Sequence, residues 1–254
     1  MPETSWFKMF KFLIFGEELN SLIIFEHERK EDLITITDEY RLNHLNSVLK
    51  IKLNQNLKIS LLGSGLGQAE VKLIEKNRIE LELSSEITQC DYPEWHLLVG
   101  LSRPPTMKKI LEHATSLGVT HFHFFTGELS EKSYADSKIW EENTSQKVLL
   151  DGLSQSARYW KLPKISIHKT IESIPSFDGF DRRISSLSDG SHSKMEKLDS
   201  KQPLVLAFGP ERGFTQAEDN ALRSKGFQAF SLGQGVLRVE IAVFSALGQC
   251  HLLL

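Results

Sequence analysis

The feature that most constrains this 254-residue sequence lies in its last fifty residues, where two short apolar runs each end in a glycine-containing turn. Residues 204–208 contain no polar side chain and lead into Gly209-Pro-Glu-Arg-Gly213. Residues 229–232 lead into Gly233-Gln-Gly235. Short apolar runs bounded by turns are typical of buried strands, and open parallel sheets bind ligands where strands end beside helix starts. The pattern therefore predicts an α/β fold with a ligand site at these two turns.

A helix signal follows each turn. Thr215-Gln-Ala-Glu218 has the spacing of a capping box, in which each side chain accepts a hydrogen bond from the other residue's backbone. After Gly235 an apolar segment continues to Leu254. We expect one helix that begins after Thr215 and a final helix that runs to the end of the chain.

Composition places the chain among ordinary globular proteins, with 40% hydrophobic and 25% charged residues. Residues 6–15 are apolar, but Lys8 and Lys11 interrupt them and the stretch is too short to span a bilayer. We therefore expect no signal peptide, no transmembrane helix and no membrane partner. Cys90 and Cys250, far apart in the sequence, fit a reduced, cytoplasmic chain without a disulfide.

The charge distribution argues against a broadly basic surface. The formal net charge is −3; residues 1–88 contain 11 Lys and Arg against 14 Asp and Glu, and residues 89–254 contain 19 of each. A nucleic-acid partner would have to be contacted by local basic patches, because the overall field of neither half attracts a polyanion.

Two regions differ in their hydrophobic patterns. Before residue 89, short runs with period-two alternation predict a small β-barrel or sandwich interrupted by one helix at 39–49. After residue 89, strand-like and helix-like segments alternate, which indicates a mainly parallel sheet. We expect domains at 1–88 and 89–254, with a flexible surface loop at 176–202, where Ser, Asp and Lys dominate. The expected strands are 22–25, 33–37, 57–62, 69–74, 79–83, 96–101, 119–125 and 165–169, and the expected helices of the second region include 105–117 and 141–160.

Two histidines and one glycine-rich segment invite functional interpretations that local context disfavours. His121 and His123 share one face of a predicted strand, but no cysteine or further histidine lies at ligand spacing. We expect structural histidines and no metal site. Gly63-Ser-Gly-Leu-Gly67 resembles part of a dinucleotide fingerprint, yet it lies between two strand-like runs, so a hairpin turn fits better.

The order of the C-terminal motifs resembles the ribosomal RNA small-subunit methyltransferase E (RsmE) family of SPOUT methyltransferases. The resemblance rests on Gly-Pro-Glu-x-Gly-Phe from Gly209 and Leu-Gly-x-x-Val-Leu-Arg-x-Glu-x-Ala from Leu232. Further matching segments are His44-Leu-Asn-Ser-Val-Leu-Lys50, Ser130-Glu-Lys-Ser133 and Gln155-Ser-Ala-Arg158 with Pro163. The resemblance covers nearly the whole chain and is strongest after Leu204.

This resemblance implies a SPOUT-type α/β domain with a C-terminal trefoil knot, preceded by a small PUA-like β-barrel that binds RNA. It implies a homodimer without a metal, which uses S-adenosylmethionine to methylate N3 of a uridine in small-subunit (16S) ribosomal RNA, free or in the assembled subunit. The implied catalytic residues are Arg238 and Glu240, and the implied RNA-binding residues are His44, Lys50, Lys132, Arg158 and Arg212. The implied cofactor-binding residues are Leu206, Phe208, Gly209, Glu211, Gly213, Leu232, Gly233, Gln234, Val236 and Leu237.

Departures from the family pattern keep an alternative open. Arg212 stands where the family has glycine, and a positive φ there would cost arginine roughly 1 kcal/mol or more. Val239 and Ile241 replace two threonines, and no arginine precedes Arg29. These changes also fit a non-catalytic RNA-binding or ribosome-associated protein that keeps the fold. An α/β enzyme with another nucleotide is disfavoured because no phosphate-cradling loop precedes a helix.

Overall fold

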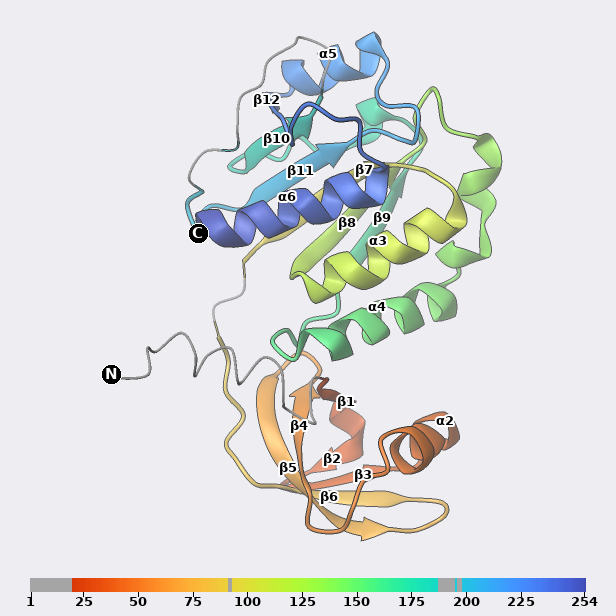
Figure 1. Cartoon of the computed structure of the whole chain (residues 1–254), viewed down its shortest axis with the longest axis vertical. Helices are drawn as coiled ribbons and strands as arrows, with labels where there is room; N and C mark the ends of the chain where they lie inside the picture. Colours follow the sequence, from red (N-terminus) through yellow and green to blue (C-terminus); the bar gives the residue numbers. More distant parts are fainter. Residues whose placement is uncertain (1–19, 91–92, 187–194, 196–197) are drawn as a thin grey trace, which may run out of the picture. The chain divides into compact units, whose positions relative to one another are not determined.

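The structure is a computed structural model that describes residues 20–90, 93–186, 195 and 198–254 (Figure 1). The expectations for residues 6–15 therefore lie outside the described residues. The chain divides into two compact units, Met1–Gln89 and Cys90–Leu254. In the described part of the chain, no helix is both long and apolar enough to cross a membrane.

The first unit is a six-stranded sheet in the order β1-β4-β5-β6-β3-β2, in which β1 pairs with β4 in parallel and the other pairs are antiparallel. All five expected strands of this region are present, and a two-residue strand, β2, adds to them. The sheet's inward-facing Ile, Leu and Val side chains form one buried core. The strands are β1 Leu22–Ile24, β2 Arg29–Lys30, β3 Leu33–Ile36, β4 Asn56–Leu61, β5 Gly65–Ile74 and β6 Ile79–Leu83.

The helical segment and the glycine turn of this unit match their predictions. Helix α2, Glu39–Asn43, begins at Asp38, whose carboxylate accepts a hydrogen bond from the Arg41 backbone at 2.8 Å. A π-helical turn, His44–Val48, continues it, and the chain then reverses at Lys50 with φ +50°. Gly63, with φ +82°, lies in the turn between β4 and β5, so the glycine-rich segment is a hairpin.

The second unit contains a six-stranded sheet in the order β12-β10-β11-β7-β8-β9, in which every pair is parallel. This confirms the α/β class and the parallel sheet expected from strand and helix alternation. The strands are β7 Trp95–Gly100, β8 Val119–Phe125, β9 Lys164–His168, β10 Asp181–Ser185, β11 Leu204–Phe208 and β12 Gln228–Phe230.

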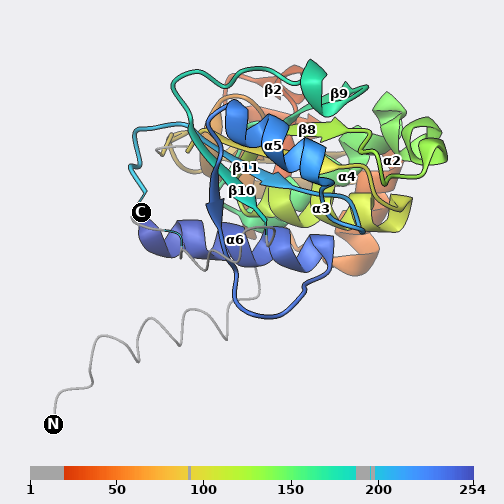
Figure 2. The ribbon, with the colours of Figure 1, turned by 90° about the horizontal axis from the view of Figure 1, so that it is seen from above.

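Helices cover both faces of this sheet (Figure 2). Helices α3 (Pro104–Ser116), α4 (Glu142–Ser156) and α6 (Val239–Leu253) share one apolar core with the sheet. Helix α5 (Gln216–Ser224) covers the other face, where Leu222 packs on a second core. Burial on both faces explains why β11 has no polar side chain.

The expectation of a flexible loop over 176–202 is wrong for its central part. Residues Asp181–Ser185 form β10, which lies between β11 and β12, and Ile184 is fully buried. The strand was hidden by its polar composition. Arg183 donates hydrogen bonds to both carboxylate oxygens of Asp181, at 2.6 and 3.1 Å, so the charges in this strand are paired. Residues 187–194 and 196–197 lie outside the described part.

Candidate functional site

A cavity of about 490 Å³ opens at the carboxyl ends of β10, β11 and β12. Three chain segments line it: the end of β10 with Ser185 and Ser186, the β11–α5 turn over 208–216, and the β12–α6 turn over 230–233 and 235–237. Asp219 of helix α5 and Val239 and Ala242 of helix α6 complete the wall. The cavity thus lies where the two glycine turns were expected to form a ligand site.

The β11–α5 turn is held by close backbone packing. A side chain at Gly209 would place its Cβ 2.7 Å from the backbone of residues 213–214, and one at Gly100 would lie 2.5 Å from Pro210. Gly213 has φ +77° and no atom within 4 Å of a Cβ position, so it combines a conformation that favours glycine with open space. Both contacts and the positive φ require the glycines that the sequence supplies.

Arg212 does not carry the strain considered from the sequence. It is exposed and is not among the non-glycine residues with positive φ; the left-handed conformation falls on Gly213 instead. Arg212 lies on the cavity wall next to Glu211. Arginine at this position therefore costs no backbone strain and adds a cation to the cavity rim.

Glu218 joins this turn to a neighbouring loop. Its Oε2 accepts from the Thr215 N–H at 2.8 Å while the Thr215 hydroxyl accepts from the Glu218 N–H at 3.2 Å, which confirms the capping box. Its Oε1 accepts from the Glu128 N–H at 2.9 Å. The carboxylate is buried, and it ties the loop after β8 to the start of α5. The capping pattern could not show this second role.

The β12–α6 turn is open to solvent. Residues 233–238 are all exposed, and Val236 is 89% exposed. One local contact supports the turn: the Ser231 hydroxyl accepts from the Gly233 N–H at 3.2 Å and donates to the Gly233 carbonyl at 3.1 Å. Below it, the rings of Phe208 and Phe230 meet edge to face with centroids 6.3 Å apart. The cavity therefore has an apolar floor and an exposed backbone lip.

Most of the expected cofactor-binding residues lie on this cavity. Leu206 is instead buried in the core beneath it, and Gln234 is exposed outside the lining. Among the polar lining residues, the sequence reasoning missed Ser185, Ser186 and Ser231, at the ends of β10 and β12, and Asp219 of α5. The expected residues that line the cavity are Phe208, Glu211, Leu232, Val236, Leu237 and the three glycines 209, 213 and 233.

The two expected catalytic residues face different environments. Arg238 is exposed at the N-cap of α6, between the cavity-lining Leu237 and Val239. Glu240 is buried, and its Oε1 lies 3.8 Å from the Nζ of Lys109 on α3. Glu240 thus pairs with Lys109 and joins α6 to α3.

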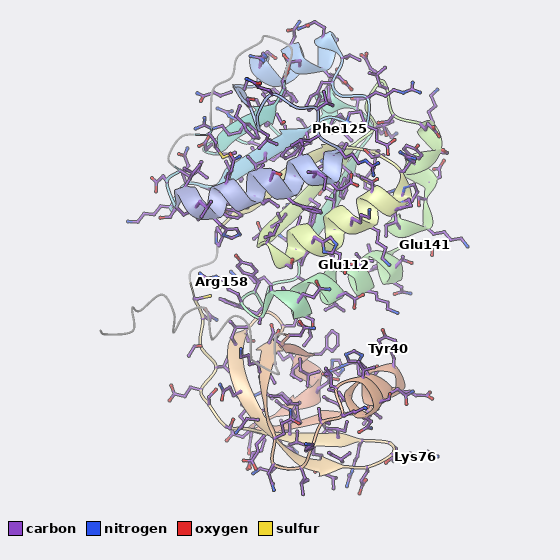
Figure 3. The ribbon with its side chains drawn as sticks, viewed as in Figure 1. Tyr40, Lys76, Glu112, Phe125, Glu141 and Arg158 are labelled. Atoms are coloured by element: carbon purple, nitrogen blue, oxygen red, sulfur yellow. The ribbon has the colours of Figure 1, made fainter. Side chains whose placement is uncertain are left out.

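The expected RNA-binding residues are spread over both units. In the second unit, Lys132 begins a 3₁₀ turn, and Arg158 follows the end of α4 (Figure 3). In the first unit, His44 and Lys50 lie on the π-helical turn and directly after it. One further cation near the cavity was missed: the Arg103 Nε donates to Glu211 at 2.8 Å, and this contact with the carboxylate raises the pKa of the guanidinium.

Comparison with known proteins assigns the family. A model of the RNA methyltransferase domain matches residues 89–251, well over half of the chain. Ribosomal RNA small subunit methyltransferase E 1 of Borreliella burgdorferi is 30% identical over 236 residues, which cover 90% of this chain and 95% of that protein. The chain belongs to the RsmE family. The family member from Treponema pallidum is 28% identical over 242 residues, covering 89% of this chain and 88% of that one.

Solved structures support the same fold for this RsmE family member. The RsmE structure from Neisseria gonorrhoeae bound to S-adenosyl methionine has a TM-score of 0.74 at 23% identity and covers 92% of this chain and 98% of that one. A Legionella pneumophila methyltransferase in complex with bound SAM has a TM-score of 0.72 at 18% identity, over 91% and 97%. The matched domain, 89–251, includes every residue that lines the cavity.

Proposed function

We propose that this chain transfers the methyl group of S-adenosylmethionine to N3 of a uridine in small-subunit ribosomal RNA. The observation that carries the proposal is the cavity at the ends of β10, β11 and β12, formed by the glycine turns within the matched RNA methyltransferase domain. Relatives with this fold are bound to S-adenosyl methionine in their structures, which supports the same ligand here.

The cavity fits this cofactor in size and chemistry. Its volume of about 490 Å³ falls in the range of small-molecule sites, roughly 300–1,000 Å³. The rings of Phe208 and Phe230 offer an apolar floor for an adenine. Gly213 and Gly233 have no atom within 4 Å of their Cβ positions, so a ligand can approach their backbone. Serine hydroxyls supply polar groups to the lining.

The chain's residues have positioning roles in this reaction. When bound, the cofactor supplies a methyl group on a sulfonium, which is activated for in-line displacement. Arg238, exposed at the cavity lip, is placed to hold an RNA phosphate or to favour loss of the uridine N3 proton through its positive charge. Glu240 fixes the first turn of α6 through Lys109, and so holds Arg238 in place.

We further propose that the first unit is the PUA-like barrel and that it binds RNA through His44 and Lys50. In the second unit, Lys132, Arg158 and Arg212 supply the local basic contacts that the near-neutral overall charge requires. The substrate is small-subunit ribosomal RNA, free or assembled, in the cytoplasm. Cys90 and Cys250 are both free thiols.

The C-terminal helix supports a homodimer. Ile241 is 45% exposed and Leu252 is 86% exposed, and the adjoining cavity lip exposes Val236 and Leu237. A second copy seated on α6 would cover these apolar side chains and close the open side of the cavity. We propose this homodimer, together with the family's trefoil knot around α6, as the active form. Ile241→Glu should give a monomer by light scattering and little methyl transfer by assay. Leu129→Glu changes an exposed position outside α6 and should remain a dimer.

Calorimetric titration with S-adenosylmethionine tests the cavity directly. Gly213 and Gly179 form a matched pair, because both have positive φ, +77° and +84°, and open space around a Cβ, but only Gly213 lines the cavity. Gly213→Ala should weaken binding roughly tenfold or more, about 1.4 kcal/mol, while Gly179→Ala should bind like the wild type. Equal affinity in both variants would place the ligand elsewhere.

The same titration separates the enzyme from a binding-only protein. Arg212→Gly should bind the cofactor like the wild type, because Arg212 is unstrained. Binding by Arg212→Gly but not by the wild type would favour a non-catalytic RNA-binding role. Methyl transfer is then measured on small subunits and on free small-subunit RNA, with nucleoside analysis for 3-methyluridine. Arg238→Ala should lose transfer and keep cofactor binding, and methylation at another atom would overturn the N3 assignment.

A further inference from the structure

Four histidines from three adjacent strands meet on one face of the parallel sheet. His96 lies on β7, His121 and His123 on β8, and His168 at the end of β9; strand pairing places His96 beside His121. Ring nitrogens of His96, His121 and His123, one from each, all lie within 4.8 Å of one another. These three residues are called the histidine cluster below. Among the described residues, the cluster and the cavity lining share no member.

The nitrogen separations suit a shared ion. His123 Nε2 and His96 Nδ1 lie 3.1 Å apart. Two imidazole nitrogens bound to one tetrahedral Zn²⁺ at about 2.0–2.1 Å would be separated by about 3.3 Å. His121 stacks on His123 with ring centroids 3.9 Å apart, so its ring would have to rotate out of the stack to direct a third nitrogen at the same ion. Three neutral imidazoles with a free fourth position form a common donor set for transition metals.

Two rings of the cluster have a hydrogen-bonding partner for their other nitrogen, and the third has a carboxylate nearby. His121 Nε2 lies 2.8 Å from the Ser166 hydroxyl, and His123 Nδ1 lies 3.2 Å from His168 Nε2. His96 Nε2 lies 3.6 Å from a carboxylate oxygen of Glu94. Histidines that bind metals usually donate their second N–H to such a group, which fixes the ring and its tautomer. The remaining nitrogens are His121 Nδ1 and the pair His96 Nδ1 and His123 Nε2, which contact each other at 3.1 Å. A bound ion would replace that contact.

Aromatic side chains shield the cluster and keep its rings neutral. Phe177 lies edge-on to His123 with centroids 5.0 Å apart, and Phe180 lies 4.7 Å from His96. Burial lowers the pKa of His96 and of His121 to about 4 and that of His123 to about 3, with neighbouring histidines and the exposed Lys164 as lesser causes. Neutral imidazole is the form that binds a metal ion.

We propose that His96, His121 and His123 bind one divalent transition-metal ion, with Zn²⁺ as the expected species, at a site separate from the methyl-transfer cavity. The ion would link β7 to β8 beneath Phe177 and Phe180, and so brace the half of the sheet away from the cavity. A packed, metal-free histidine stack is the competing arrangement. It needs no ion, because the rings already have hydrogen-bonding partners.

The test is a titration of untagged protein, stripped with a chelator, with Co²⁺ followed by visible absorbance and with Zn²⁺ as competitor. We expect saturation at one Co²⁺ per chain, with the intense visible absorption bands of a Co²⁺ ion that has few ligands. One equivalent of Zn²⁺ should displace the Co²⁺. His121→Asn and His96→Asn, at half-buried positions, should each weaken binding at least about tenfold. His113→Asn, on α3 outside the cluster, should bind like the wild type.

Folding of the variants is checked by circular dichroism and by cofactor titration, so that loss of metal is not confused with loss of structure. Absence of saturable Co²⁺ binding in the wild type would overturn the proposal in favour of the metal-free stack. So would undiminished binding in both folded cluster variants, because the ion would then be held elsewhere.

Discussion

The two halves of the parallel sheet present different kinds of chemistry. The half formed by β10, β11 and β12 ends in glycine turns that expose backbone around a cavity. The half formed by β7, β8 and β9 instead presents packed imidazole side chains on the strands themselves. One sheet thus carries a cavity lined by main-chain turns and a cluster built from side chains. Substitutions in one half should leave the chemistry of the other unchanged.

Alanine substitutions of buried aromatic residues should give the largest measurable difference between the two halves. Phe208, on β11, is part of the cavity floor, and Phe122, on β8, is fully buried in the same core. Each substitution to alanine should lower the free energy of unfolding by about 3–5 kcal/mol, measured by urea denaturation. Only Phe208→Ala should also lose S-adenosylmethionine binding in folded protein. Equal loss of binding in Phe122→Ala would mean that the halves are coupled.

Acidification should destabilise the metal-free protein through the histidine half. The pKa values of the cluster lie at about 3 to 4 in the folded chain and near 6.5 when unfolded. Below pH 6.5 the unfolded chain therefore binds more protons than the folded chain. The contribution of these histidines to the free energy of unfolding is fully present above that pH and falls as the pH decreases toward 4. The urea midpoint should be lower at pH 5 than at pH 7. His121→Asn should reduce this difference, and an unchanged difference would contradict the assignment to the cluster.

A smaller effect is expected at the cap that joins the loops of the cavity half. Glu218→Ala removes the carboxylate that accepts hydrogen bonds from the backbone N–H groups of Thr215 and Glu128. It should lower the free energy of unfolding by about 1–2 kcal/mol. Asp38→Ala removes the side chain that caps the N-terminus of α2 in the first unit. Thermal denaturation should show similar losses of stability for the two variants, but only Glu218→Ala should weaken the binding of S-adenosylmethionine. If Asp38→Ala weakens this binding equally, the effect is one of global stability.

The finest distinction comes from two serines with analogous supporting roles. Ser231 bonds to the backbone of Gly233, and Ser166 bonds to the ring of His121. Ser231→Ala should weaken the binding of S-adenosylmethionine only a few-fold, in line with about 1 kcal/mol for a hydrogen bond. It should leave Co²⁺ binding intact. Ser166→Ala should show the reverse pattern. Each variant is titrated with S-adenosylmethionine and with Co²⁺. Parallel changes in the two affinities would contradict the independence of the two halves.

Sequence patterns predicted the cavity half because its features are contiguous. The turn from Gly209 to Gly213 and the capping box from Thr215 to Glu218 each require only neighbouring residues, and both are present. The expected strands of both units are also present, with small shifts at their ends. The parallel sheet and its α/β class were predictable because buried strands and amphipathic helices alternate along the chain.

Features that depend on distant residues could not be predicted in this way. Strand β10 has charged residues at its first three positions, and only its pairing with β11 and β12 makes it a strand. His96 lies 25 residues before His121, and strand register alone brings the two together. Local ligand spacing therefore gave no sign of the histidine cluster, because its members come from different strands. The part-buried Glu128–Glu218 contact spans 90 residues and left no local signal.

The attachment of β12 to the sheet has a consequence for motion. Strand β12 has three residues, and β10 is its partner in the described sheet, at the sheet's outer end. Short segments held by few contacts open locally at a lower free energy than central strands do. The outer wall of the cavity should therefore exchange its amide hydrogens faster than β7 and β8. A ligand that bridges β11 and β12 would slow that exchange, because the wall could then open only after the ligand has left.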